Sequence, residues 1–394
     1  MANINSAMLE WAREQAGLSV DDAVRLLDIK STKTATAEEK LIAYEHGKAP
    51  SRSMLARMSK AYRRPLLTFY LNEPPKKTDR GEDFRTLPEN LDPQQNFHVD
   101  VLIRDIKARQ SIIRETLIDE DEAEALPFVG QFSSEQGIDE ISRKITELFD
   151  IDLDTYRSKR NYADAFKYLR QKVEAKGVFV LLKGNLGSYH TDIDLKVFRG
   201  FALCDDVAPF IVINHQEAKS ARAFTLLHEL THLLLGQTGI SSSIVERKIE
   251  KFCDRVASEV LLPEQEFSEF DPENLEFEDL KEAISFYAQD RRISSAQVAY
   301  RCLQDGLINK GLWSKLRDYY YEQWVEGRRL EKERGRNNEG GVNQNIVRRS
   351  YLGELVNFVQ RMNFSGALST TKAGVVLGVK PLKVQNLFDN AQVV

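Results

Sequence analysis

Two histidines and a glutamate near the middle of the chain have the residue types and the spacing of a hydrolytic metal site. Residues 228–232 read His-Glu-Leu-Thr-His, inside the apolar stretch AFTLLHELTHLLL, whose pattern predicts a helix. Residues four apart on a helix lie about 40° apart in rotation, so His228 and His232 present both imidazoles to one point, as two ligands of one zinc ion would. Glu229 lies beside that point, placed to take a proton from water that the zinc activates.

A hydrolytic zinc ion needs a third protein ligand, with the fourth position left for water. The next helical pattern, ERKIEKFCDRVASEVLLPEQ, offers four acidic candidates: Glu246, Glu250, Asp254 and Glu259. The pattern favours Glu259, because it lies in the apolar stretch 257–262, where a carboxylate without a partner would be very costly. Glu246 and Glu250 lie among basic residues, which is typical of a solvated helix face. We therefore predict Glu259 as the third ligand, with one zinc ion per chain.

The elements around this motif are expected to be mostly helical, with one small sheet. The β-branched and aromatic runs GVFVLL, KVFRGFALC and PFIVIN predict short strands within 177–214. The charged and then Gly/Asn-rich stretch 324–345 predicts a linker or mobile hairpin. Helical patterns occupy 93–176, about 218–236 and 244–262, the chain from 276 onward, and a last module at 349–390. The predicted fold class is therefore α+β and mostly helical.

Composition limits the class of protein. The 394 residues are 42% hydrophobic and 29% charged, as in globular proteins. The first residues have no apolar signal segment, and no run approaches the roughly 18 apolar residues of a membrane span. The three cysteines are far apart and form no C-x-x-C pair, which is typical of reduced thiols. We expect a cytoplasmic protein with no membrane partner, and the net charge of −5 gives no overall electrostatic case for nucleic acid.

Residues 1–72 predict a string of short helices. The expected N-caps are Ser6, Ser19, Thr36 and Ser51, and Thr36 with Glu39 has the spacing of a capping box. The Pro-rich, charged stretch 72–83 predicts the end of this module.

Two segments, INHQEAKSARAFTLLHELTHLLLG and EKFCDRVASEVLLPEQ, resemble the ImmA/IrrE family of metallo-endopeptidases. In that family the helix with H-E-x-x-H follows a strand that ends in Asn, here Asn214. A second helix carries the third ligand in an A-x-E-L-L-x-P-like segment, here 257–263. The resemblance implies a zincin-like core over about residues 80–310, with zinc on His228, His232 and Glu259 and with Glu229 as general base. One departure is Asp254, where the family often has Asn.

Residues 7–71 are similar to the Xre-type helix-turn-helix domain that often precedes this peptidase. Five basic residues of this segment are candidates for contacts with the DNA backbone: Lys30, Lys33, Lys40, Lys48 and Arg52. The recognition helix, however, would begin with Ala37-Glu38-Glu39, and carboxylates there would face the phosphates. A protein-interaction or dimerisation module is therefore an open alternative. Residues 294–308 and 369–388 also have a helix-turn-helix pattern, and we predict interaction surfaces there.

These patterns divide the chain into four parts. They are an Xre-like helix-turn-helix module at 1–75, a zincin-like metallopeptidase domain at 76–275, a helical, helix-turn-helix-like extension at 276–330, and a linker with a C-terminal helical module at 331–394.

The function that the resemblance implies is regulated, narrow cleavage of a partner protein. That partner is typically a transcriptional repressor, and the cleavage belongs to a stress or mobile-element response. The alternative is a DNA-binding regulator or an antitoxin that binds a toxin partner, with a structural or rarely catalytic metal site. Glu229 favours the peptidase, because a structural zinc ion has no use for a general base.

Overall fold

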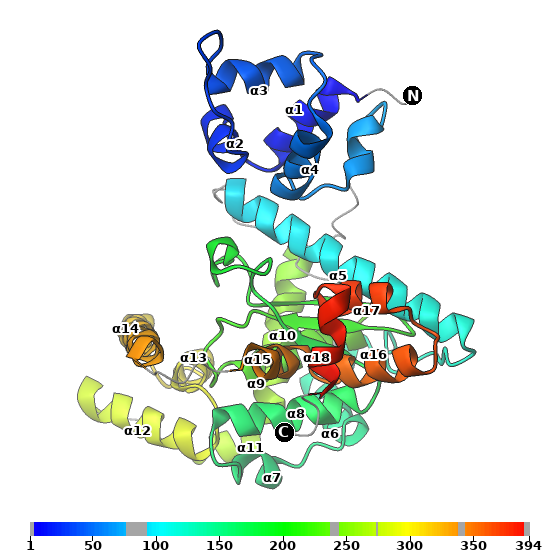
Figure 1. The fold of residues 1–394 in the computed structure, drawn as a ribbon. Helices are drawn as coiled ribbons and strands as arrows, with labels where there is room; N and C mark the ends of the chain where they lie inside the picture. Colours follow the sequence, from blue (N-terminus) through cyan, green and yellow to red (C-terminus); the bar gives the residue numbers. More distant parts are fainter. Residues whose placement is uncertain (1–3, 76–92, 237–243, 273–274, 338–342, 390–394) are drawn as a thin grey trace. The chain divides into compact units, whose positions relative to one another are not determined.

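The computed structural model describes residues 4–75, 93–236, 244–272, 275–337 and 343–389, and the chain divides into two compact units (Figure 1). The first unit runs to Ile106 and also takes Asn185–Val197, while the second comprises Lys107–Gly184 and Phe198–Val394. The four-part division predicted from the sequence, with boundaries after residues 75, 275 and 330, stays a prediction. Among the described helices, none combines the length and the apolar character that a membrane crossing requires.

The first unit is built from short helices with local capping. They are α1 (Ser6–Gln15), α2 (Val20–Leu26), α3 (Ala37–Glu45), α4 (Arg52–Ala61) and the 3-10 helix η1 (Leu66–Tyr70), with the 3-10 turn η4 (Tyr189–Thr191) in the same unit. Ser19 and Ser51 cap α2 and α4, and Thr36 forms a full capping box with Glu39, all as predicted. The predicted cap at Ser6 is wrong, because the side chain of Asn5 accepts the hydrogen bond from the Ala7 amide.

The second unit contains one three-stranded sheet, in the order β1-β3-β2. The strands are β1 (Phe179–Leu182), β2 (Gly200–Leu203) and β3 (Phe210–Ile213), and every residue in them is buried. β1 runs parallel to β3 and β2 runs antiparallel to it, with Gly200 opposite Ile213. The small sheet predicted within 177–214 is therefore confirmed.

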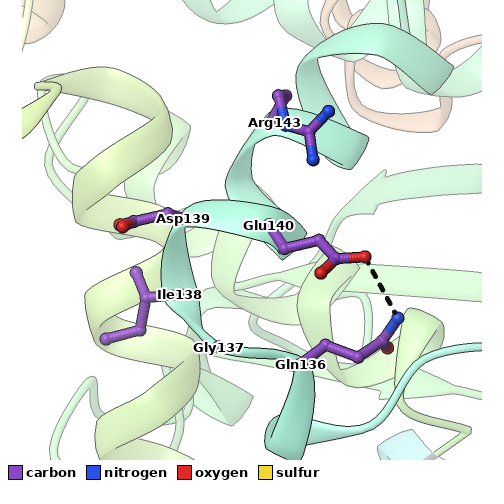
Figure 2. A pocket seen from close by; sticks show the side chains of 6 residues that line it. All are labelled: Gln136, Gly137, Ile138, Asp139, Glu140 and Arg143. Carbon is purple, nitrogen blue, oxygen red and sulfur yellow. Dashed lines mark hydrogen bonds between the residues drawn. The ribbon is translucent and has the colours of Figure 1, made fainter.

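Helices cover the sheet and enclose the core of this unit. They are α5 (Pro93–Asp119, from Lys107 onward), α6 (Ile138–Leu148), α7 (Leu153–Arg157), α8 (Tyr162–Glu174), α9 (Arg222–Leu234) and α10 (Ile244–Leu261), with the 3-10 turn η3 (Ser134–Gln136) before α6. At the start of α6 lies a pocket of about 590 Å³ that six residues line: Gln136, Gly137, Ile138, Asp139, Glu140 and Arg143 (Figure 2). These residues include no histidine or cysteine, and we assign the pocket no role.

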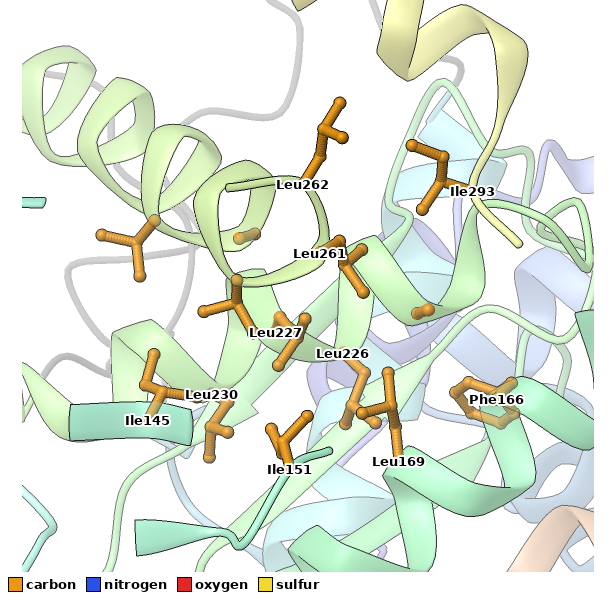
Figure 3. Close-up of a cluster of buried hydrophobic side chains, with 14 of the residues drawn as sticks. Ile145, Ile151, Phe166, Leu169, Leu226, Leu227, Leu230, Leu261, Leu262 and Ile293 are labelled. Atoms are coloured by element: carbon orange, nitrogen blue, oxygen red, sulfur yellow. The ribbon is translucent and has the colours of Figure 1, made fainter. Parts of the chain in front are cut away.

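The core joins α9 and α10 to helices from both ends of the unit (Figure 3). Three leucines of α9 form the centre of this core: Leu226, Leu227 and Leu230. They pack with buried side chains on either side, namely Ile145, Ile151, Leu169, Leu261 and Ile293. Burial of such side chains is worth about 1.5–3 kcal/mol each before entropy is counted, so this packing holds α9 in one rotation about its axis. That rotation decides where His228 and His232 point.

The chain after α10 is helical. Its elements are α11 (Glu264–Phe267), α12 (Phe277–Asp290), α13 (Ser295–Gln304), α14 (Lys310–Asn337), α15 (Gln344–Leu352), α16 (Leu355–Phe364), α17 (Thr370–Leu377), the 3-10 turn η5 (Pro381–Lys383) and α18 (Val384–Asp389). Ile284 and Val298 belong to the same core as Leu226, so the extension predicted at 276–330 packs into the second unit.

The predicted linker at 324–345 is wrong as far as Asn337, because α14 continues through it. The segment is rich in Arg, Lys and Glu, which are strong helix formers. Arg329 also pairs with Glu326 at 2.6 Å and with Glu333 at 3.9 Å, three and four residues away. Residues 338–342 of the predicted linker lie outside the described residues.

Candidate metal centre

Helix α9 carries both histidines toward α10. Its core-facing side holds Leu226 and Leu230, both fully buried, and its end is marked by Gly236 at φ +68°. His232 is only 2% exposed, and the side chain of His228 is 14% exposed. The four-residue spacing thus places the two rings side by side, as the sequence predicted, with 4.9 Å between ring centroids.

Three ligand-type side chains converge between α9 and α10. The Nε2 atoms of His228 and His232 are 3.1 Å apart. The carboxylate oxygens of Glu250 lie 3.2 Å from the first and 3.4 Å from the second. Ligand atoms at ordinary zinc distances and tetrahedral angles lie roughly 3.3–3.4 Å apart. The two imidazoles and the carboxylate therefore fit three corners of a zinc tetrahedron.

The structure does not bring Glu259, the third ligand predicted from the sequence, to the histidines. Its carboxylate accepts a hydrogen bond from the Glu264 amide at 2.8 Å and lies 3.4 Å from Arg301, which is buried. Glu259 lies nine positions after Glu250, an offset of about 180° in rotation, so the two carboxylates leave α10 on opposite sides. Burial of Glu259 does require a partner, but that partner is a guanidinium instead of a metal.

The helical period contained a signal for Glu250. Cys253, Ala257 and Leu261 form the stripe of α10 that is fully or almost fully buried. Glu250 lies three, seven and eleven residues before them and so extends the same stripe by one turn. The basic neighbours of Glu250 suggested a solvated helix face. The helical period that Glu250 shares with the buried residues shows that its side chain lies on the buried side instead. The side chain of Glu246, another candidate, lies outside the described residues.

The electrostatics of the cluster favour a cation between these groups. Burial by itself would raise the pKa of Glu250, but the two imidazoles beside it lower that pKa to about 2. Burial would lower the pKa of His228, yet the carboxylates of Asp254 and Glu250 raise it well above its ordinary value. The carboxylates of Asp254 and Glu250 thus stabilise the positively charged form of the His228 imidazole. A bound divalent cation would satisfy the same carboxylates.

Glu229 lies beside the cluster and is not one of its three converging groups. It is 6% exposed, and burial raises the pKa of its carboxyl. The first residue of β2 passes close to it, since a Cβ on Gly200 would lie 2.8 Å from Glu229 Oε1 and 2.8 Å from Thr225 Cγ2. Glycine at this position therefore leaves the space that the Glu229 carboxyl occupies.

Asn214 closes the turn between β3 and the segment that leads to α9. It is fully buried, its Nδ2 donates to the Phe198 carbonyl at 3.2 Å, and its Oδ1 accepts from the Gln216 amide at 3.1 Å. A Cβ on Gly184 would lie 1.9 Å from Asn214 Oδ1, so the segments around these two residues approach closely here. Asn214 thus positions the entry to α9 without taking part in the cluster.

Asp254 approaches the other side of the His228 ring. Its Oδ1 lies 3.0 Å from His228 Nδ1, within ion-pair distance, although the ring direction is not that of a hydrogen bond. An oxygen this near the second ring nitrogen is placed to orient a ligating histidine, and loss of such a partner lowers metal affinity about 10–100-fold. We expect that drop in zinc affinity for Asp254→Ala, measured by competition with a chromogenic chelator. Asp254→Asn, which keeps an oxygen there, should stay nearer the wild type; equal affinity of Asp254→Ala and wild type would contradict this role.

The candidate DNA contacts of the first unit are solvent-facing, with one exception. Lys30, Lys33, Lys48 and Arg52 are exposed, whereas Lys40 is half-buried and donates from Nζ to the Lys30 carbonyl at 2.6 Å. The Glu39 carboxylate accepts from the Thr36 amide at 2.8 Å, so a capping role accounts for its place at the start of α3. Ten residues separate α2 from α3. DNA binding by this unit stays a prediction.

Comparison with known families gives a match over the middle of the chain. Residues 180–303 match the family model Peptidase_M78, described as the IrrE N-terminal-like domain. The matched segment contains His228, His232 and Glu250, and it supports the resemblance to ImmA/IrrE metallopeptidases. Searches of curated proteins and of solved structures found no significant match.

Proposed function

We propose that this protein is a zinc-dependent endopeptidase that regulates a partner protein by specific cleavage. The observation that carries the proposal is the convergence of His228 Nε2, His232 Nε2 and the Glu250 carboxylate at separations of 3.1–3.4 Å. These three residues would hold one zinc ion and leave a fourth position for water. The matched peptidase domain over 180–303 supports the same reaction class.

The chain's own residues supply the remaining chemistry. When bound, zinc provides a Lewis acid that makes water acidic enough to attack a peptide carbonyl near neutral pH. Glu229 accepts the proton that this water releases and delivers it to the departing amine as the C–N bond breaks. Burial raises the pKa of the Glu229 carboxyl, which brings it closer to the range where one group both accepts and releases a proton.

The proposed substrate is a protein, and a DNA-binding repressor is the partner that the family resemblance implies. The first unit would then serve as an Xre-like module that brings the peptidase to DNA or to that partner. The rival proposal, an antitoxin or regulator with a structural metal, gives Glu229 no task beside the metal.

Co-expression with the product of an adjacent gene tests the proposal. If that product is a small repressor, we expect wild-type protein to convert it to one or a few fragments, identified by intact mass. Chelation of zinc in the purified mixture should stop fragment formation, and added zinc should restore it. A neighbour that is a nuclease-like toxin, bound and inhibited but never cut, would instead establish the antitoxin function.

A further inference from the structure

The C-terminal helices α17 and α18 have the connection of a helix-turn-helix. Only Gly378, Val379 and Lys380 separate the end of α17 from the continuous helical segment formed by η5 and α18. A turn of three to four residues that contains glycine is the usual one in this motif. The two helices contact each other and α16, and they lie together in the red end of the chain in Figure 1.

Two glycines make this tight turn possible. Gly378 has φ +67°, where other residues are strained, and a Cβ there would lie 2.7 Å from an Arg109 nitrogen. Within α17, a Cβ on Gly374 would lie 2.8 Å from the Val379 carbonyl oxygen. The backbone of the turn therefore rests directly on α17. Behind the turn, Ala373, Leu377, Val384 and Leu387 are buried and fix the two helices against each other.

The surface residues of this motif and of the helices before it are mostly basic where they are charged. Residues 343–389 contain six basic residues and two acidic ones, in a chain whose net charge is −5. They are Arg348, Arg349, Arg361, Lys372, Lys380 and Lys383 against Glu354 and Asp389. The three lysines are exposed, and within the described residues their ammonium groups make no ion pair or hydrogen bond.

Exposed residues of η5 and α18 are suited to base edges. Gln385 and Asn386 of α18 are exposed, and amide side chains pair with adenine in the major groove. Leu382, in η5, is 95% exposed, which is costly in water but matches apolar contact with a thymine methyl group. Gln385 Nε2 donates to the Asp389 carboxylate at 2.8 Å, and Gln385 exchanges this partner for a base edge when DNA binds.

We propose that α17, η5 and α18 bind double-stranded DNA, with the η5–α18 segment in the major groove. Lys372, Lys380 and Lys383 contact phosphates and set the register, while Leu382, Gln385 and Asn386 face the bases. Residues 369–389 hold three lysines against one acidic residue, Asp389, and this excess of positive charge suits the DNA backbone. The amide side chains and the exposed leucine along the same short helical segment suit base edges, which favours DNA over an acidic protein surface. The first unit is the weaker DNA candidate, since ten residues separate its two helices and α3 begins with Glu38 and Glu39. This binding is independent of the zinc chemistry.

The test uses the full-length protein and a fluorescein-labelled, random-sequence duplex of about 30 base pairs, with anisotropy followed from 50 to 200 mM salt. The triple variant Lys372→Ala, Lys380→Ala, Lys383→Ala should reduce the slope of log K against log[salt] by about 2–3, since each phosphate contact contributes roughly 0.9. A charge-matched control changes Lys167, Lys176 and Lys315 to Ala, three exposed lysines outside the motif, and should keep the wild-type slope. Unchanged thermal unfolding establishes that each variant is folded.

Two further experiments distinguish the C-terminal motif from the first unit. A variant with Ala at four basic positions of the first unit should still bind the duplex through the C-terminal motif; these positions are Lys30, Lys33, Lys48 and Arg52. A photoreactive residue in place of Gln385 should crosslink to the duplex, and one in place of Lys315 should not. Loss of binding only in the variant of the first unit would overturn the proposal. So would an absence of salt-sensitive binding by the wild type at 50 mM salt, which would leave this face for a protein partner.

Discussion

The Glu229→Gln variant should keep its zinc and its fold while cleaving the partner protein roughly 10²–10⁴-fold more slowly than the wild type, the contribution typical of a general base. Glutamine has nearly the same size as glutamate, so it fits the space beside Gly200. It cannot accept a proton from water, and it lies outside the three groups that would hold the metal. The measurement is the rate of partner cleavage at equal zinc content.

A second buried glutamate provides a matched control. Glu217 is 5% exposed, and burial raises the pKa of its carboxyl as it does for Glu229. It lies outside the metal cluster, so Glu217→Gln should cleave the partner near the wild-type rate. Generic peptides are poor substrates for a narrow peptidase, and the comparison therefore needs the true partner. Equal cleavage by wild type and Glu229→Gln would rule out the proposed mechanism and favour a structural metal.

The Glu250→Gln variant should lose zinc affinity by more than about 100-fold, because even residues that only support a ligand are worth about 10–100-fold. Glu259→Gln should hold zinc almost as the wild type does. Gln keeps an oxygen that can accept from the Glu264 amide, and Arg301 retains Asp305 at 2.6 Å. Dialysis against a defined free-zinc concentration, followed by elemental analysis, measures both variants.

The pair of variants separates two assignments of the third ligand. Both substitutions remove one negative charge from the same helix, so a general effect of charge on α10 would weaken zinc equally in both. Retention of zinc by Glu250→Gln together with its loss from Glu259→Gln would restore the assignment made from the sequence. Elemental analysis that finds no zinc in wild-type protein, even after zinc is added, would remove the metal site altogether.

The features that could be predicted from the sequence are those that depend on a few neighbouring residues. The four-residue spacing of His228 and His232 brings their rings together on any straight helix, whatever the helix packs against. The capping box of Thr36 and Glu39 and the strands within 177–214 depend in the same way on local pattern, and the structure confirms them. In contrast, α14 continues through a charged stretch because ion pairs between residues one turn apart stabilise the helix. The composition of the stretch does not reveal these pairs.

Which carboxylate completes the cluster depends on how distant helices pack. Glu250 and Glu259 lie on one helix, and the rotation of α10 about its axis determines which of them faces α9. Burial of Cys253, Ala257 and Leu261 sets that rotation, which turns Glu250 toward the histidines. Glu259 then meets Arg301 of α13, a residue 42 positions later in the sequence. No local pattern encodes such a contact, because it exists only after distant helices have packed around one core.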